Sequence, residues 1–414
     1  MILQFFLLSG KLLSVMKKLT FKHTIVSCFV GYVVQAVVCN FAPLLFVTFS
    51  NEFNISLSKI TALVTVTFVV QILVDFIAAK YVDKIGYRQS LVLAHVLSAL
   101  GFVMMGILPD LFNPFVALLM SVTVYSIGSG LLEVLISPVV ESCPTKNKKG
   151  MMSLLHSFYC WGSVAVILLS TVFFAIFGRD NWRLLSMLWA VLPVINCVFL
   201  FFVPINTPVE DDEKIPVSSM AKNKMFFLLI LLMVAAGASE QAMSQWASTF
   251  AETGLHVSKS VGDLAGPCLF AVLMGSARLL YSFISEKVNL VRYMTFSSVL
   301  CIAAYLLASL SGNAVVSLIG CGLCGFSVGV LWPGTISIAA KHLKNGGTAL
   351  FALLALAGDM GCTVGPTAIG LISDHLGSVK SGLIYGIVFP ILLIAGLIGL
   401  RKVQKAKTKN TADR

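Results

Sequence analysis

Long apolar stretches recur along this chain and constrain its fold more than any other feature. A helix needs about 20 apolar residues to cross the hydrocarbon core of a bilayer. Of the 414 residues, 58% are hydrophobic and only 11% are charged, whereas average proteins carry about 25% charged residues. The sequence therefore predicts an all-α membrane protein. Its twelve predicted transmembrane helices cover residues 24–47, 59–79, 89–108, 115–139, 151–177, 183–204, 225–250, 263–283, 294–310, 314–339, 348–372 and 381–400.

A hydrophilic stretch divides these spans into two sets of six. It runs from Ile205 to Lys224 and contains four consecutive acids, from Glu210 to Glu213. We therefore predict two pseudo-symmetric six-helix bundles joined by a solvated cytoplasmic linker. The predicted divisions are a cytoplasmic N-terminal segment at 1–23, bundles at 24–204 and 225–400, the linker at 205–224 and a basic cytoplasmic tail at 401–414. Met1 and Met16 both remain open as the start of the chain.

Positive charge is concentrated on one side of the predicted spans. If the spans alternate in direction, most of the 29 lysines and arginines fall on the side of the two termini. Segments of this kind are typically cytoplasmic. We therefore expect both termini in the cytoplasm and the protein in a bacterial cytoplasmic membrane. This placement accounts for the net charge of +11 without a nucleic acid as partner.

The two sets of six spans carry an internal repeat. Asp83 follows span 2 as Glu286 follows span 8, and Gly150 opens span 5 as Gly347 opens span 11. Parallel repeats of six helices are a transporter architecture, in which the solute site lies at the membrane midplane between the halves. The repeat therefore indicates a transporter of a small solute.

The loop after span 2 points to a family. Residues 79–88 resemble the loop 2–3 signature of the major facilitator superfamily, although Ala79 replaces its first glycine. The matching positions are Asp83, Lys84, Gly86 and Arg88. The segment from Gly275 to Glu286 is similar to a weaker second copy. The resemblance implies a twelve-helix secondary transporter in which these loops, Asp83 and Glu286 included, gate the cytoplasmic side.

Shorter motifs resemble the fucose–proton symporters of that superfamily. Glu133 followed by Ser137-Pro138 is similar to their span-4 Glu followed by Asn-Pro. The segments 156–162 in span 5 and 237–240 in span 7 are similar to two further motifs. The acidic residue of their span 1 has no carboxylate counterpart here, where the polar groups are Gln35 and Asn40. The resemblance implies proton-coupled symport of a sugar-like solute.

Four acids lie deep within predicted spans. Glu133 is the clearest, because it interrupts an apolar run from 115 to 140. A carboxylate at that depth is costly and is expected to face a protein interior or a water-filled cavity. We interpret it as a proton carrier; a structural carboxylate bonded to a neighbouring helix is the alternative. The other candidates for proton coupling are Glu240, Asp359 and Asp75.

Asp75 and Arg278 occupy matched positions in the repeat, each eight residues before its loop acid. Their opposite charges favour contacts across the two halves, with Arg278 in a gating role; two unrelated local pairs are the alternative. We expect Arg278 to face span 5 and Asp75 to face residues 355–359 of span 11. Asp83 and Glu286 are expected to form a cytoplasmic latch at the open helix N-termini of spans 5 and 11, where free N–H groups stabilise a carboxylate; loops that only anchor the orientation of the chain are the alternative.

Aromatic and amide side chains near the predicted midplane are candidates for binding a solute. Uncharged amides and aromatic rings favour a neutral polar solute such as a sugar, although aromatic residues are also common at membrane interfaces. The candidates are Gln35, Asn40, His156, Tyr159, Trp161, Gln241, Gln245, Trp246 and Trp332.

Other chemistries find little support. Most of the ten cysteines lie within spans, and the pair Cys321 and Cys324 is better explained by helix packing than by redox chemistry. We find no metal-ligand pattern, nucleotide motif or catalytic constellation. We therefore expect no cofactor and no enzymatic activity, a proton gradient as energy source, and a monomer whose partners are a small solute, protons and lipid.

Two other functions stay open. A proton/drug antiporter would carry a Gly-x-x-x-Gly-Pro signature in span 5; here a similar pattern, from Gly361 to Pro366, occurs only in span 11. A membrane receptor or enzyme on a transporter scaffold is the third possibility, without an extramembrane domain to support it.

Overall fold

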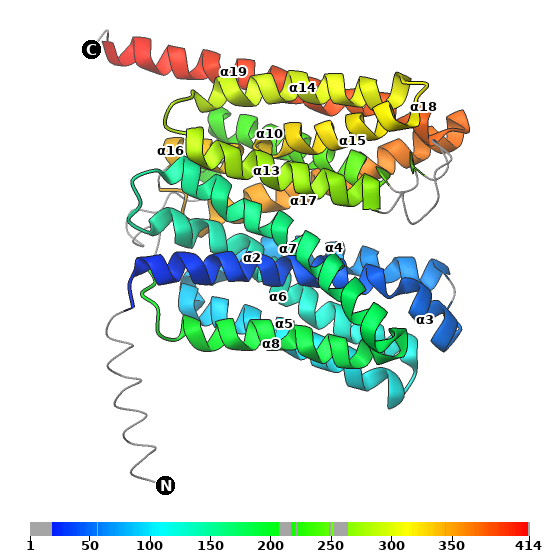
Figure 1. Ribbon diagram of the computed structural model, residues 1–414. Coiled ribbons are helices and arrows are strands. Elements are labelled where there is room, and N and C mark those ends of the chain that lie inside the picture. The colour runs from blue at the N-terminus through cyan, green and yellow to red at the C-terminus, as the bar shows by residue number, and fades with distance from the viewer. Residues whose placement is uncertain are drawn as a thin grey trace, which may run out of the picture.

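The protein is an all-α bundle whose helices mostly run along one common direction (Figure 1). The computed structural model describes residues 19–55, 57–206, 217–220, 222–247, 250–251, 264–343 and 345–412. Within these residues, twelve helices are long and apolar enough to cross a membrane. The predicted fold class is therefore confirmed, and the chain is an integral multi-pass membrane protein.

Helices of the first half lie together in the lower part of Figure 1. They are α2 (Phe21–Leu44), α3 (Phe46–Phe53), α4 (Leu57–Ile85), α5 (Tyr87–Ile107), α6 (Pro114–Ser142), α7 (Lys148–Phe177) and α8 (Trp182–Leu200), with the 3₁₀ turns η1 (Leu108–Asp110) and η2 (Arg179–Asn181). Gly86 separates α4 from α5 with a φ of 97°, a backbone conformation that favours glycine. This turn explains the glycine of the loop signature.

The second half lies above the first in that view. Its elements are α9 (Val217–Met220), α10 (Lys224–Ser244), the π-helical turn η5 (Leu264–Cys268), α13 (Leu269–Ile284), α14 (Leu290–Leu310), α15 (Ala314–Val328), α16 (Leu331–His342), α17 (Gly347–Leu376), α18 (Val379–Ile384), η6 (Tyr385–Ile387) and α19 (Val388–Ala412). The span predicted at 314–339 is thus divided between α15 and α16. A break at membrane depth is tolerated only where neighbouring protein satisfies the freed backbone groups.

Asparagine side chains fix the start of several helices. Asn113 accepts a hydrogen bond from Val116 N–H at the start of α6, and Asn147 accepts one from Gly150 N–H at the start of α7. Such N-caps satisfy donors that have no partner within the helix. These caps explain why the helices begin where the apolar runs follow a short polar loop.

Contacts between the halves involve two main helix pairs, α7 with α13 and α4 with α17. α2 begins and α19 ends at the same end of the molecule, on the left of Figure 1, which we call the terminal face. Every hydrogen bond between described residues that joins the halves lies between the middle of the helices and this face. The halves are therefore fastened together there.

Some predicted features fall outside the described residues. These are positions 1–18 of the N-terminal segment, positions 207–216 and 221 of the linker with the acids at 210–213, positions 248–249 and 263 of two predicted spans, and the last two residues of the basic tail.

Candidate functional site

A cavity of ≈ 90 Å³ lies between the halves near the middle of the helices. Its walls come from α2, α4, α6 and α7 of the first half and from α10, α13, α16 and α17 of the second. Ten residues singled out from the sequence line it: Gln35, Glu133, Ser137, His156, Tyr159, Glu240, Gln241, Arg278, Trp332 and Asp359. The residues singled out from the sequence therefore include most of the polar side chains that line this cavity.

Four predicted solute-binding residues lie away from this cavity. Asn40 donates to Ser163 Oγ at 3.1 Å and to the Ala36 carbonyl, and Trp246 donates its indole N–H to the Pro366 carbonyl at 2.9 Å. Gln245 is exposed and donates to Gln241. Trp161 packs beside Gly275 of α13. Asn40, Trp161 and Trp246 therefore take part in contacts between helices, whereas Gln245 does not.

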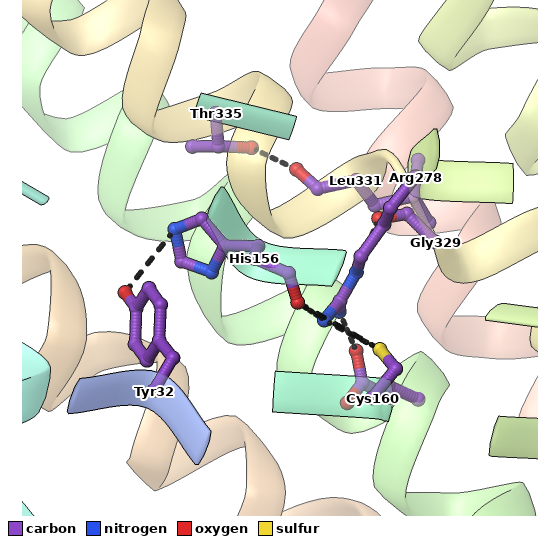
Figure 2. A network of polar contacts seen from close by, with 8 residues as sticks. Tyr32, His156, Cys160, Arg278, Gly329, Leu331 and Thr335 are labelled. Carbon is purple, nitrogen blue, oxygen red and sulfur yellow. Dashed lines mark hydrogen bonds and ion pairs between the residues drawn. The ribbon is translucent and has the colours of Figure 1, made fainter. Parts of the chain in front are cut away.

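Arg278 is the most heavily bonded side chain of the site (Figure 2). Its Nε donates to the Gly329 carbonyl at 2.8 Å, which satisfies a backbone group freed by the break between α15 and α16. Its Nη1 donates to the His156 carbonyl at 3.0 Å and to Cys160 Sγ at 3.1 Å. The expectation that Arg278 faces span 5 is therefore confirmed, because both acceptors lie on α7.

The fourth partner of Arg278 is Glu240 on α10. Arg278 Nη2 lies 3.1 Å from Glu240 Oε2, and both residues are buried, with exposed fractions of 3% and 8%. An ion pair of this kind is stable only while both partners remain, because either charge alone would be left without compensation. Glu240 therefore has its charge neutralised in this conformation.

Glu133 has a different environment. Its Oε2 accepts a hydrogen bond from Gln35 Nε2 at 2.9 Å, and the side chain is partly exposed to the cavity. No lysine, arginine or histidine of the described residues forms an ion pair with it. Gln35 Oε1 has no hydrogen-bond partner among them. The Gln35 amide can therefore either donate a hydrogen bond to the Glu133 carboxyl group or accept one from it.

Tyr32, Ser137 and His156 form a triangle next to Glu133. Tyr32 OH lies 3.0 Å from Ser137 Oγ and 3.4 Å from His156 Nε2, and Ser137 Oγ lies 3.3 Å from the same nitrogen. Figure 2 shows Tyr32 and the His156 ring facing one another. Each of the three groups is able to donate or accept a hydrogen bond. The triangle can therefore exchange its internal bonds for bonds to solute hydroxyl groups.

Gln71 is a cavity residue that the sequence reading missed, as are Tyr32, Cys39, Phe68, Phe351 and Cys362. Its Nε2 donates to Ser129 Oγ at 3.0 Å. A signal was available, since Gln71 lies four residues before Asp75 and so shares its helix face.

Asp75 lies in α4, where that helix packs against α17. Its exposed fraction is 0%, and neither carboxylate oxygen has a hydrogen-bond partner among the described residues. Asp359 on α17 is 5% exposed, and its Oδ2 is likewise without a partner there. The packing agrees with the expectation that Asp75 faces this part of span 11.

At the terminal face, Asp83 contacts the first turn of α17. Thr348 Oγ1 donates to Asp83 Oδ1 at 2.5 Å, and Tyr87 OH bonds to the same hydroxyl. Arg88 donates to carbonyls at the end of α8, among them Leu200 at 2.6 Å. Three residues of the loop signature thus have different roles. Asp83 joins the two halves, Arg88 bonds within the first half, and Lys84 is exposed.

The repeat-related Glu286 does not mirror Asp83. It is exposed, and no hydrogen bond or ion pair to a described residue engages it. Asn147 instead occupies the N-terminus of α7, where its Oδ1 accepts from Gly150 N–H at 2.8 Å. Asn147 Nδ2 also donates to Ser285 Oγ at 2.7 Å across the halves. The expected Glu286 contact is therefore absent because the amide already fills that position.

A second cavity, of ≈ 1040 Å³, opens at the terminal face between the two helix pairs. Phe351 lines both this cavity and the central one. Its side chain is therefore placed between them. Within the part of the chain that the structure describes, no cluster of three or more His, Cys, Asp or Glu could hold a metal ion.

Within the described residues, twelve helices that could cross a membrane form two halves around a central cavity, an arrangement typical of membrane transporters. The sequence profile of the Major Facilitator Superfamily matches residues 25–353. The chain therefore belongs to the Major Facilitator Superfamily. No curated protein matches it by sequence.

Solved transporters share its fold. FucP, in the outward conformation, aligns over 91% of this chain and 98% of its own, with a TM-score of 0.76 and 12% identity; another solved structure describes it as the E. coli fucose:proton symporter. The proton:xylose symporter XylE aligns over 92% and 95%, with a TM-score of 0.76 and 12% identity. The human organic anion transporter MFSD10 aligns over 91% and 99%, with a TM-score of 0.69 and 14% identity.

Proposed function

We propose that this transporter moves a small, neutral, sugar-like solute by alternating access and couples the movement to protons at Glu133. The observation that carries the proposal is the position of Glu133, which faces the central cavity with one amide partner and, among the described residues, no paired cation. An acid at membrane depth is by default a functional group. The names of FucP and XylE as proton symporters support the same reading.

Gln35 suits Glu133 to both protonation states. When Glu133 is ionised, Gln35 Nε2 donates to it, as observed at 2.9 Å. When Glu133 is protonated, its O–H can donate to Gln35 Oε1, which has no other partner among the described residues. A flip of the amide exchanges the two arrangements. Glu133 can therefore keep a hydrogen bond to Gln35 in both protonation states.

The solute would bind beside this pair. Gln241, His156 and Tyr32 supply uncharged hydrogen-bonding groups, and Trp332 supplies an aromatic face. A cavity of ≈ 90 Å³ is small beside the roughly 300–1,000 Å³ of typical ligand pockets. The halves must therefore move apart to admit a solute, and Phe351 lies on the route toward the terminal face.

The remaining expectations belong to the same proposal. Both termini would lie in the cytoplasm of a bacterial cell, so that the terminal face is the cytoplasmic face. The protein would act as a monomer, use the proton gradient without a cofactor and catalyse no chemical reaction. The divisions at 24–204 and 225–400 would be the two moving bundles.

Purified protein in liposomes provides the test. We expect one or more neutral sugars from a labelled panel to accumulate when an inward proton gradient is imposed, and to equilibrate without it. Efflux of organic cations driven by the gradient, with no sugar movement, would instead establish the drug antiporter. Transport of a sugar that ignores the gradient would overturn the coupling but leave the solute class intact.

A further inference from the structure

We propose that Asp75 and Asp359 together form a second proton-binding site, shared between the two halves, that favours closure of the terminal face. The inference deepens the proposed function and rests on it, because it adds a gating proton to the one carried by Glu133. It is drawn from the register of α4 and α17, from the burial of both acids and from their missing partners.

The register of α4 and α17 places the two acids at one depth. The helices run in opposite directions and meet where Thr348 bonds to Asp83. From that contact, Asp75 lies eight residues away along α4 and Asp359 lies eleven residues away along α17. These separations correspond to about 12 Å and about 16 Å of helix. The two acids are therefore level within about one turn.

Both carboxyl groups lack the partners that an ionised, buried group requires. Asp75 is 0% exposed, and Asp359 is 5% exposed. Among the described residues, neither carboxylate oxygen of Asp75 has a hydrogen-bond partner, and Oδ2 of Asp359 has none either. Two ionised carboxylates at such a place repel one another and are poorly solvated. One shared proton removes a negative charge and supplies a donor between the two acids.

Within the part of the chain that the structure describes, no cation is left to neutralise them. Arg278 is engaged by Glu240 and by three further acceptors. His156 Nε2 faces Tyr32 and Ser137. The other titratable groups around the pair, from the elements packed against α4 and α17, add negative charge or none: Glu133 on α6, Cys39 on α2, and Cys362 on α17 itself. A proton is the remaining counter-charge.

The pair spans two bodies that separate during alternating access. When the terminal face opens, α4 leaves α17, the O–H of one acid loses the carboxylate of the other, and water can take the proton. Low pH should therefore favour the closed terminal face, and high pH should favour opening. In the closed state, the bond between Asp83 and Thr348 joins α4 to α17 at the terminal face. The shared proton joins the same two helices deeper in the molecule.

Spin labels can measure this without any solute. Gln89→Cys and Lys341→Cys place labels at exposed positions of opposite halves at the terminal face. Distances between them are recorded by pulsed electron resonance in lipid nanodiscs from about pH 5 to pH 8. We expect the closed population of the parent protein to fall several-fold as the pH rises. Asp75→Asn should keep the face closed throughout, because the amide donates permanently to Asp359.

Further variants decide the matter. Asp359→Asn should abolish the pH response in the same way, and it serves if Asp75→Asn does not fold. Asp180→Asn, an exposed acid at the opposite end of α7, should leave the response intact. Glu133→Gln should also keep the response while losing solute accumulation, which separates this inference from the proposed function. A pH response that survives both aspartate substitutions, or that Glu133→Gln removes, overturns the shared site.

Discussion

Asp75 and Arg278 hold equivalent positions in the two halves, yet their surroundings are opposite. Arg278 has four partners, and two of them lie across the interface on α7. Asp75 has none among the described residues. The arginine is therefore a fixed connection, whereas the aspartate is a group whose state can change. The repeat places Asp75 and Arg278 at the same depth in the two halves, but it does not give them the same charge or the same partners.

The loop acids show the same contrast. Asp83 bonds to Thr348 on α17, while Glu286 is exposed and Asn147 takes the equivalent helix start. A charged contact thus closes one side of the interface, and a neutral amide closes the other. We therefore expect removal of the loop acid to weaken the contact at Asp83 but not the contact at Asn147.

The largest effect is expected for Arg278→Gln. The substitution leaves Glu240 buried without its cation and the Gly329 carbonyl without its donor. Breaking one partner of a buried pair typically costs about 3–5 kcal/mol. We expect a large loss of thermal stability in detergent, measured by a fluorescence melt. The matched control is Arg183→Gln, since Arg183 pairs with Glu52 and Asp110 at a partly exposed site, where such pairs contribute about 0–1 kcal/mol. Equal losses in the two variants would show that Arg278 is not a structural connection.

Glu133→Gln should abolish coupling rather than stability. The amide resembles the protonated acid and can still bond to Gln35. We expect solute to reach equal concentrations on both sides of a liposome membrane despite a pH gradient, while solute counterflow persists. Asp110→Asn, at the surface near α8, is the control and should accumulate solute normally. Normal accumulation by Glu133→Gln would remove Glu133 as the carrier.

A smaller effect is expected for Asp83→Asn. The amide oxygen can still accept from Thr348, but the bond loses the strength that an ionised acceptor gives it. A loss of about 1 kcal/mol would open the terminal face several-fold more often. The spin-label pair at Gln89 and Lys341 reports that population. Glu286→Gln should leave it unchanged, and a shift of equal size in both variants would contradict the asymmetry of the loop acids.

The sequence predicted the fold because apolar stretches long enough to cross a bilayer recur along the whole chain. Apolar length alone marks the twelve spans, and the acids stand out against them. It also placed Arg278 beside span 5, because the repeat fixes its depth. The break after Val328 was not foreseen, since it depends on Arg278 reaching a freed carbonyl from another helix. The cavity roles of Tyr32 and Gln71 were missed because polar residues on one helix reveal their partners only after packing.

The exchange of Glu286 for Asn147 shows the same limit. Either residue type can satisfy a helix N-terminus, and loop sequence does not say which one reaches it. Only the folded loop shows that the Asn147 amide is closer. Sequence therefore identified where the halves should be fastened, but not which side chain fastens the second pair.

The smallest effect separates the two roles of Asn147. Asn147→Ala removes the cap of α7 and the bond to Ser285, so we expect a loss of about 1 kcal/mol in stability and a modest opening of the terminal face. Asn147→Ser retains a capping hydroxyl but is too short to keep both bonds. It should recover most of the stability in a thermal melt while the spin-label distances still show the opening. If the serine variant instead restores both, the cap alone organises this side, and the Asn147–Ser285 contact is not a fastening between the halves.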